Sequence, residues 1–564
     1  MKGGAILKKI NVNILKLIIF ILPFLWGGFY EFVTFIIGTI LSVNLIWLYI
    51  KNKKIYIEKN NIILITFVLV ISSFLTIFWA IDTNSAIFGF LKCLCLLLFA
   101  LNVTQLEEKE RNDLFTVIPI SSICMLSISA ILAIIPATKS YVVSTSNRLT
   151  GFFQYANVCA MYILISMIIV YFSNWNNKLK IFCLSIFTIS ILFTGSRTVF
   201  ALMILCIIVL AVHKRKESKY YIFGFLGLLG ICTAFALITN NFQNIGRFLT
   251  SSIFSSTFVG RIVYIEDSLK LLSKWILGYG YLGYSYIFPK VQTAMYTTKF
   301  LHNDYLQIAL DYGIISAIVF IYFIVKSICL KENNSRNKLI LFLLGIHMFF
   351  EFDIEFLSIF FILLLCMSNK STVSKKIDIS LVILLLIGFV GITELYYGIA
   401  SFSNFADNYE IANSMLPNYT EALECELINK IQNNDLKSAK IIADKILENN
   451  KYIVSCYEIE AMYYSSNNEV DKMIKMQEKA IELNKYDISE YENYVLFLSK
   501  QIEKSIEQER YDKADLYIEK VINIEKKLEN TKNNMNKLSK YFVKQSNLEL
   551  SEDIKNYIKV LNQK

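Results

Sequence analysis

The strongest constraint on the fold of this chain is a succession of apolar runs that fills its first 400 residues. A bilayer core is crossed by about 20 apolar residues in a helix. Two pairs of runs are short, so each pair is either a tight hairpin or one broken span. The sequence therefore predicts an all-α polytopic membrane protein with about 12–13 transmembrane helices, drawn from thirteen runs: 14–30, 31–50, 61–80, 85–104, 114–136, 153–172, 181–195, 198–212, 220–239, 306–329, 339–352, 355–368 and 378–397.

Charge divides the chain into two parts. Hydrophobic residues make up 55% of the sequence and charged residues only 18%, which excludes a single soluble globule. Residues 1–400 carry 33 Lys and Arg against 18 Asp and Glu, whereas residues 401–564 carry 23 against 28. The basic residues of the first part gather in alternate short loops, as expected for the cytoplasmic side of a membrane. This pattern predicts a cytoplasmic N-terminus and an extracytoplasmic C-terminal domain.

The C-terminal part, residues 401–564, contains a helical repeat. The segment Glu448-Asn-Asn-Lys-Tyr452 recurs as Glu482-Leu-Asn-Lys-Tyr486 at an offset of 34, and a third copy follows at Glu519 after an offset of 41. A period of 34 resembles that of tetratricopeptide (TPR) helical hairpins, although the consensus Trp and Pro are absent. We expect an α-solenoid, which either binds a partner on its concave surface or serves only as a spacer. Its cysteines, Cys425 and Cys456, form one disulfide or remain as two thiols.

One outer loop, residues 240–305, is much longer than the others. Ordered loops of this length are uncommon unless they are functional. Within it, residues 262–276 place apolar side chains on one helical face and Glu266, Asp267 and Lys270 on the other, which predicts an amphipathic helix at the membrane surface.

The loop ends in His302-Asn303-Asp304-Tyr305 at the start of a span. His302 is the only histidine predicted at the outer surface, and a neutral imidazole can accept a proton at physiological pH. Asp304 is close enough in sequence to orient it. An interfacial histidine without a chemical role fits the same position. A second histidine, His347, lies inside an apolar run that is followed by Glu351, Asp353 and Glu355.

Three arginines, Arg148, Arg197 and Arg261, fall on the predicted outer side, against the general charge pattern. A guanidinium group binds phosphate oxygens through two parallel hydrogen bonds. Several such groups at head-group level suit a lipid-linked phosphate or pyrophosphate. Each of them also fits an arginine that merely reaches toward lipid head groups.

The sequence lacks several motifs that would indicate other chemistry. The outer loops contain no Asp-x-Asp pair, and the chain has neither His/Cys metal spacing nor a Gly-rich phosphate loop. We therefore predict no metal and no cofactor. The competing class of function is a transporter for a lipid-linked glycan, which should show duplicated halves that this sequence lacks.

Four sequence blocks, in order, resemble the O-antigen ligase and polymerase superfamily of bacterial membrane glycosyltransferases. The resemblance covers about residues 1–400, and the segment from Gly345 through His347 to Asp353 also resembles a late span of that family. The four blocks are Arg148-Leu-Thr-Gly-Phe-Phe-Gln-Tyr-Ala-Asn157, then Gly195-Ser-Arg197, then Gly260-Arg261 with Leu277-Gly-Tyr-Gly280, and His302-Asn-Asp-Tyr-Leu306 with Asp311-Tyr-Gly313.

The resemblance implies transfer of a glycan from an undecaprenyl-pyrophosphate carrier to an acceptor hydroxyl, without metal and with inversion. It implies that His302 is the general base and that Arg148 and Arg261, joined by Arg197, hold the pyrophosphate. Asn157, Asn303, Asp304 and His347 would support them.

The family contains polymerases, ligases and protein oligosaccharyltransferases, so the acceptor is a glycan, a wall polymer or a protein. An Ile-, Lys- and Asn-rich composition favours an AT-rich, Gram-positive host and therefore polymerisation or transfer to protein over ligation to a lipid core. The expected location is the bacterial cell membrane. A protein is the expected kind of partner for the TPR-like domain if that domain binds one, and we expect no binding to nucleic acid.

Overall fold

The computed structural model describes residues 2–52, 55–58, 60–213, 256–368, 374–377, 381–535, 537–542 and 548–563. The chain forms two compact units. The first contains Met1–Leu75, Phe88–Ile253 and His302–Phe402, and the second contains Thr76–Ile87, Phe254–Leu301 and Ser403–Lys564. A boundary near residue 400 was predicted. The segment 76–87 and the long loop nevertheless group with the C-terminal helices.

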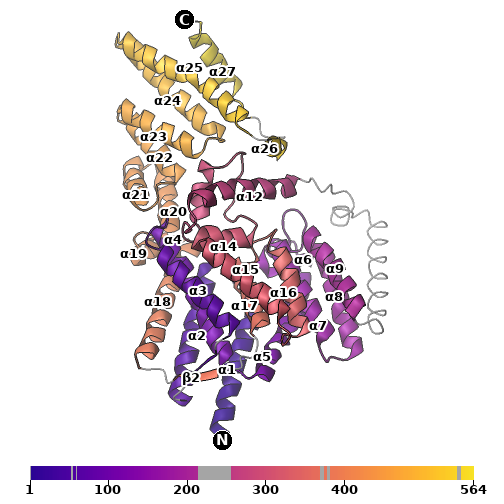
Figure 1. Cartoon of the computed structure of the whole chain (residues 1–564). Coiled ribbons are helices and arrows are strands. Elements are labelled where there is room, and N and C mark those ends of the chain that lie inside the picture. Colours follow the sequence, from indigo (N-terminus) through magenta and orange to yellow (C-terminus); the bar gives the residue numbers. More distant parts are fainter. Residues whose placement is uncertain are drawn as a thin grey trace. The chain divides into compact units, whose positions relative to one another are not determined.

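The first unit is a bundle of apolar helices (Figure 1). Its elements are α1 (Lys2–Ile21), η1 (Leu22–Phe24), η2 (Trp26–Gly28), α2 (Glu31–Asn52), β1 (Ile55–Glu58), α3 (Asn61–Thr76), α4 (Thr83–Thr104), α5 (Glu108–Phe115), α6 (Val117–Ile134), η3 (Lys139–Tyr141), η4 (Gly151–Phe153), α7 (Ala156–Phe172), α8 (Asn177–Thr194), α9 (Arg197–His213), α14 (Asp304–Tyr312), α15 (Ile314–Cys329), α16 (Ser335–His347), η6 (Asp353–Glu355), α17 (Leu357–Met367), β2 (Ser374–Ile377) and α18 (Leu381–Phe405).

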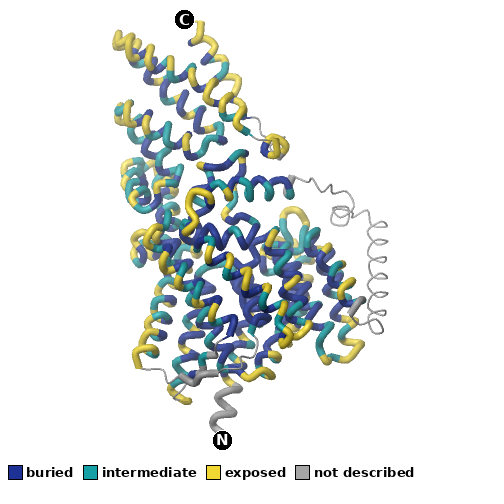
Figure 2. Tube along the Cα trace, in the orientation of Figure 1, coloured by how far each residue is buried: buried dark blue, intermediate teal, exposed yellow. Residues whose placement is uncertain are grey.

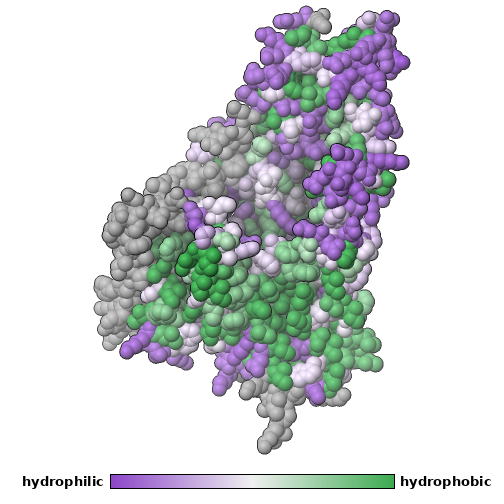
Figure 3. Space-filling view, turned by 180° about the vertical axis from the view of Figure 1, so that it is seen from behind, coloured by the Kyte–Doolittle hydropathy of each residue, from purple (hydrophilic) through white to green (hydrophobic). Residues whose placement is uncertain are grey.

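Five helices in the described residues are long and apolar enough to cross a membrane: Glu31–Asn52, Thr83–Thr104, Glu108–Ile134, Asn177–Thr194 and Leu381–Phe405. Six shorter apolar helices accompany them: Ile10–Phe24, Asn61–Thr76, Ala156–Phe172, Arg197–Ala211, Ile314–Cys329 and Leu357–Met367. The predicted run 220–239 lies outside the described residues. Hydrophobic side chains gather over a broad surface of this unit, as a helix bundle in lipid requires (Figure 3).

The two ambiguous pairs of short runs are separate helices. Gly195, with φ +60°, ends α8 in a left-handed turn, and α9 begins two residues later. In the second pair, the short helix η6 separates α16 from α17. The tight connections place polar residues of the two turns, at 194–197 and 351–355, between apolar helices.

Two helices of the first unit, α7 and α17, are buried along most of their length (Figure 2). Every residue of α17 is buried, and α7 contacts α6, α8, α9 and α16. A helix that is apolar around its whole circumference is stable only when other helices or lipid surround it. The first turn of α7 is therefore held rigidly, and this turn carries Asn157.

The strands β1 and β2 pair in an antiparallel ribbon, with Ile55 opposite Ile377. The pair joins the connection between α2 and α3 to the connection between α17 and α18. Charge patterning predicts that both connections lie on the same side of the membrane, and the pairing brings them together, while the cytoplasmic orientation stays a prediction.

The second unit consists of the loop elements and a series of helices. They are α12 (Ser256–Lys274), α13 (Gly283–Ile287), η5 (Phe288–Lys290), α19 (Tyr409–Met415), α20 (Thr420–Gln432), α21 (Leu436–Asn449), α22 (Val454–Ser466), α23 (Val470–Leu483), α24 (Ile488–Glu507), α25 (Tyr511–Asn533), α26 (Lys537–Phe542) and α27 (Glu552–Leu561).

The helices from α20 to α25 form three hairpins closed by equivalent turns. The turn residues Asn434, Asn468 and Glu509 have φ of +57°, +60° and +56°, and they follow one another at the predicted offsets of 34 and 41. After each turn residue, the next backbone N–H donates to the carbonyl five residues earlier, which closes the end of the preceding helix. The periodicity in the sequence is thus a periodicity of turns, while the TPR assignment itself stays a prediction.

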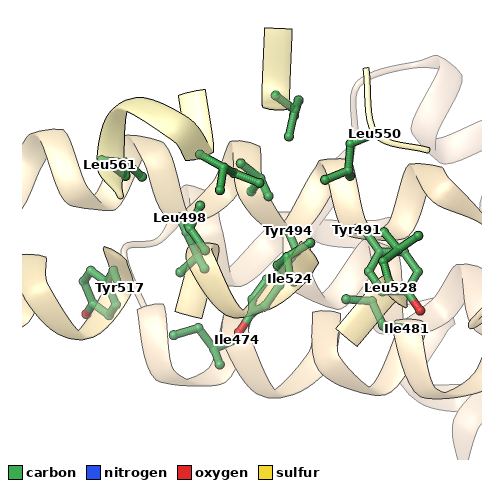
Figure 4. Packing of buried hydrophobic residues seen from close by; sticks show 14 of the residues in the cluster. Ile474, Ile481, Tyr491, Tyr494, Leu498, Tyr517, Ile524, Leu528, Leu550 and Leu561 are labelled. Atoms are coloured by element: carbon green, nitrogen blue, oxygen red, sulfur yellow. The ribbon is translucent and has the colours of Figure 1, made fainter. Parts of the chain in front are cut away.

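The hairpins share apolar cores. Tyr491, Tyr494 and Leu498 of α24 pack against Ile524 and Leu528 of α25 (Figure 4). Leu550 and Leu561, near the C-terminus, belong to the same cluster. A final helix that covers the last hairpin is needed because a repeat cannot bury its apolar face alone. The two cysteines of this part, Cys425 and Cys456, do not form a disulfide and are free thiols.

The predicted amphipathic helix is present as α12, but its buried face differs from the predicted one. Leu269, expected on the apolar face, is 47% exposed, and Asp267, expected on the polar face, is fully buried. Asp267 is buried because Thr293 and Tyr296 donate hydrogen bonds to its carboxylate. A local sequence pattern cannot anticipate partners that lie almost 30 residues away.

Candidate functional site

The imidazole of His302 lies beside a buried carboxylate. Its Nδ1 is 3.4 Å from Oε2 of Glu351, a residue with no exposed side-chain surface, while the His302 side chain remains 22% exposed. The ring also meets Phe352 edge-on, with 5.0 Å between ring centroids. His302 has φ +58°, an unfavourable value for a residue with a side chain. Such strain concentrates at functional sites because the surrounding structure must maintain it.

Glu351 is the centre of this group of residues. Its Oε2 accepts a hydrogen bond from the Tyr155 hydroxyl at 2.6 Å, and its Oε1 accepts one from Asn157 Nδ2 at 2.6 Å. Tyr155 is the residue before α7, and Asn157 lies in the first turn of that helix. Glu351 therefore connects the start of α7 to the start of α14, where His302 lies.

Arg148 extends the network from Asn157. Its Nη2 donates to Asn157 Oδ1 at 2.5 Å, and its Nε donates to the carbonyl oxygen of Thr194 at 2.7 Å. Asn157 thus bridges the guanidinium group and Glu351 through the two ends of its amide. This arrangement fixes the amide orientation, because the oxygen must face the cation and the nitrogen must face the carboxylate.

Arg197 lies close to Arg148 in the fold. The carbonyl that Arg148 binds belongs to Thr194, and Arg197 is the first residue of α9, three positions later. The left-handed Gly195 makes this sharp connection possible. Two of the three predicted arginines therefore belong to one neighbourhood, together with the N-terminal ends of α7 and α9, which carry partial positive charge.

Asn303 and Asp304 have structural contacts. Asn303 caps α14 by accepting the Leu306 N–H at 3.0 Å, and its amide donates to the Phe349 carbonyl at 3.2 Å. Asp304 was expected to orient His302. Its Oδ2 instead accepts the backbone N–H groups of Asp353 and Ile354, at 2.9 and 3.4 Å, while the carboxylate hydrogen-bonded to His302 is that of Glu351.

His347 is fully buried and binds Asp353, with 2.7 Å between Nδ1 and Oδ2. Glu355 forms an ion pair of 2.5 Å with Lys92 of α4. The alternate acidic residues Glu351, Asp353 and Glu355 therefore bind three different helices. We call the segment 351–355 the acidic turn.

Arg261 belongs to the second unit, where it lies on α12. Burial raises the pKa of the nearby Tyr264 hydroxyl, and the charge of Arg261 acts in the opposite direction. Two of the tyrosines that follow α12 are buried: Tyr281 is 2% and Tyr284 0% exposed. The contribution of Arg261 to a pyrophosphate site stays a prediction.

The residues that sequence reasoning missed are Glu351 as the partner of His302, Tyr155, and the Lys92–Glu355 pair. The available signal was the presence of three carboxylates and one lysine in otherwise apolar runs, where ionisable residues are expected to be functional. Among the described residues, no group of three or more His, Cys, Asp or Glu is arranged to hold a metal ion.

The O-antigen ligase family model matches residues 181–321, a segment that contains Arg197, Arg261 and His302. No curated protein and no solved structure matches the chain. The family match supports a relationship to O-antigen ligases and points to a glycan-transferring membrane enzyme of bacteria. Arg148, Asn157 and Glu351 lie outside the matched segment. The fold connects them to His302 through hydrogen bonds.

Proposed function

We propose that this protein transfers a glycan from an undecaprenyl-pyrophosphate carrier to an acceptor hydroxyl at the outer face of the bacterial membrane. The observation that carries the proposal is the connected series His302–Glu351–Asn157–Arg148. A partly exposed imidazole lies at one end of the series and a guanidinium group at the other, which supports a general base and a pyrophosphate-binding cation in one site. Glycan transfer from a pyrophosphate carrier requires both groups.

The base in this reaction is His302. Glu351 faces Nδ1, so in the productive tautomer Nδ1 carries the proton and Nε2 is the nitrogen that accepts one from the acceptor hydroxyl. The acceptor oxygen attacks the anomeric carbon and gives its proton to Nε2. The new bond between oxygen and carbon forms as the bond between that carbon and the pyrophosphate oxygen breaks, and the configuration inverts. Glu351 then stabilises the imidazolium cation, which returns its proton to water.

The leaving pyrophosphate keeps the electron pair of the broken bond and needs fixed positive charge around it. Arg148 is held in place by Asn157 and by the Thr194 carbonyl, and Arg197 follows at the start of α9. Arg261 is the third candidate for this clamp. Arginines that replace a divalent cation fit the absence of an Asp-x-Asp pair in the predicted outer loops.

We favour a saccharide hydroxyl as the acceptor, which makes the protein a polysaccharide polymerase or ligase. The direct test is transfer by the full-length protein in nanodiscs, supplied with a fluorescent lipid-linked glycan and resolved by chain length. We expect longer glycans on the lipid carrier for the wild type. His302→Ala should lower the rate about 10²- to 10⁴-fold, the range of general-base catalysis.

The matched control is Arg336→Ala for the arginine variants, because Arg336 binds Asn112 and stacks on Phe115 outside the site. Arg148→Ala should weaken donor binding, and Arg336→Ala should not. Near wild-type transfer by His302→Ala would remove the base. Glycan movement across the bilayer without transfer would indicate a transporter instead, and glycan found only on added protein would indicate an oligosaccharyltransferase.

A further inference from the structure

Asp82 connects the first loop segment of the second unit to the helical repeat. Its side chain is buried, and its Oδ2 accepts hydrogen bonds from the Thr420 hydroxyl and from Asn449 and Asn450, the latter two at 3.3 Å. Its other oxygen accepts the Ser85 N–H at 2.8 Å. One carboxylate thus joins residues 76–87 to the beginning of α20 and the end of α21.

The segment around Asp82 is in turn joined to the residues that follow α12. The Ile81 N–H donates to the Tyr279 carbonyl at 3.0 Å, and the Trp79 indole donates to the Gly278 carbonyl at 3.0 Å. Gly280 has φ +84° and packs against Ala80, where a side chain at position 280 would collide. The contacts run without interruption from the repeat through Asp82 to the residues that follow α12.

A second connection reaches the middle of α12. Asp267 accepts the Thr293 N–H at 2.8 Å and the Thr293 and Tyr296 hydroxyls at 3.1 Å. The Thr293 hydroxyl is also 2.7 Å from that of Ser539 in α26. The C-terminal helices are therefore connected to α12 at two places, to the residues that follow it through the segment around Asp82 and to its centre through Thr293.

Further contacts join the same two parts. Lys290 lies over the Tyr452 ring, 4.8 Å from its centroid, and Lys299 forms an ion pair of 3.1 Å with Glu421. Tyr286 packs against the apolar core of α20, α21 and α22. A repeat that served only as a spacer would not need to surround one loop with cation–π, ionic, polar and apolar contacts.

We propose that the helical repeat is a scaffold that positions α12, and that Asp82 and Thr293 are the positioning residues through which it does so. The inference rests on the proposed function, because α12 carries Arg261 of the pyrophosphate clamp. A displacement of about 1 Å in a substrate-binding group can reduce catalysis about 100-fold. The helix α12 lies within a long connection between two apolar helices, and such connections need support because they are more mobile than the elements they join.

The test compares two disruptions of the scaffold with a matched control in the full-length protein. The disruptions are Asp82→Ala and the double variant Thr293→Val with Ser539→Ala. The control is Asp435→Ala, which removes another aspartate of the repeat whose carboxylate caps α21 through the Ser438 N–H. The readouts are amide hydrogen exchange of α12 peptides in nanodiscs and the kinetic constants for donor and acceptor.

We expect both disruptions to accelerate exchange in α12 at least about threefold and to raise the donor KM about tenfold, with kcat changed less than about twofold. Asp435→Ala should accelerate exchange only in α21. A further variant combines Asp82→Ala with Thr293→Cys and Ser539→Cys, so that a disulfide joins positions 293 and 539. If this disulfide restores the donor KM, the loss in Asp82→Ala is a loss of positioning and not of folding.

Two results would overturn the scaffold proposal. One is unchanged exchange in α12, and the other is faster exchange with an altered acceptor KM but an unchanged donor KM, which would make the repeat an acceptor-binding module. If the wild type showed no transfer at all, the proposed function would fail, whereas the exchange measurements would still decide whether the repeat holds α12.

Discussion

His302 Nδ1 lies 3.4 Å from Glu351 Oε2, although 49 positions separate the two residues in the sequence. Glu351 has two further donors, Tyr155 and Asn157, and no contact with solvent. A buried carboxylate with hydrogen bonds on both oxygens is fixed in position. It can therefore hold the imidazole in one tautomer and favour its protonated form during catalysis.

Replacement of Glu351 should reduce the chemical step of transfer. Glu351→Gln keeps the shape of the side chain but removes the charge that stabilises the imidazolium, so kcat should fall about 10²- to 10³-fold with little change in donor KM. Single-turnover transfer in nanodiscs measures this directly. A variant that lost donor affinity but kept kcat would show that Glu351 supports binding instead of catalysis.

Asn157 should couple the base to the arginine clamp. Asn157→Leu removes the hydrogen bonds to the two charged groups, Arg148 and Glu351, and a hydrogen bond to a charged group contributes about 1.5–3 kcal/mol. We expect the donor KM to rise at least about tenfold and kcat to fall as well, because Glu351 loses a donor. Asn176→Ala, which removes the cap of α8, is the control for the loss of an asparagine. Equal kinetics for the two variants would contradict the coupling.

The Lys92–Glu355 pair should stabilise the acidic turn. Lys92→Met leaves the Glu355 carboxylate buried without its partner and should cost about 3–5 kcal/mol in the free energy of unfolding. The double variant Lys92→Met, Glu355→Leu should recover part of that loss because no uncompensated charge remains. Thermal unfolding in detergent compares the two proteins. If the double variant unfolded earlier than the single one, the pair would not be the cause.

The stability of the repeat should fall as pH rises. Burial and the neighbouring Glu458 raise the pKa of Glu490 to about 9, from 4.5 for a free glutamate. Between these values the unfolded chain loses the proton and the folded chain keeps it, so stability declines from about pH 4.5 to pH 9. We expect the Tm of the repeat to drop by about 2–6 °C from pH 6 to pH 9.

Glu490→Gln isolates this contribution from that of other groups with raised pKa, such as Glu424 and Glu460. The variant cannot ionise at this position, so its Tm should decline less between pH 6 and pH 9 than that of the wild type. Differential scanning fluorimetry across this range measures the difference. Parallel curves for the two proteins would show that Glu490 does not titrate in this interval.

The sequence was sufficient for features that repeat along the chain or lie close together in it. Apolar runs predicted helices, and the turns at Asn434 and Asn468 recur at the 34-residue offset that the sequence contains. Arg148 and Asn157, the first and last residues of one sequence block, are joined by a hydrogen bond. These features depend on local periodicity and short spacing, and both can be read directly from the sequence.

The partner of His302 could not be predicted in the same way. Asp304 is two positions from the histidine, and proximity in sequence favoured it over Glu351. At the start of α14, however, the Asp304 carboxylate accepts backbone N–H groups of η6. The choice between the two carboxylates depends on how α14, α16 and η6 pack, and no single segment of the sequence contains that information.

The acidic turn also sets a rule for sequence change. Its three carboxylates occupy alternate positions, and each binds a partner on a different helix. Insertion or deletion of one residue between 351 and 355 would change the direction of every later side chain, so the three carboxylates could no longer bind their partners at the same time. Homologous chains that share this site should therefore keep the length of this five-residue segment. They should differ in length elsewhere, for example between the turns at Asn468 and Glu509, where the offset of 41 already exceeds the other offset of 34.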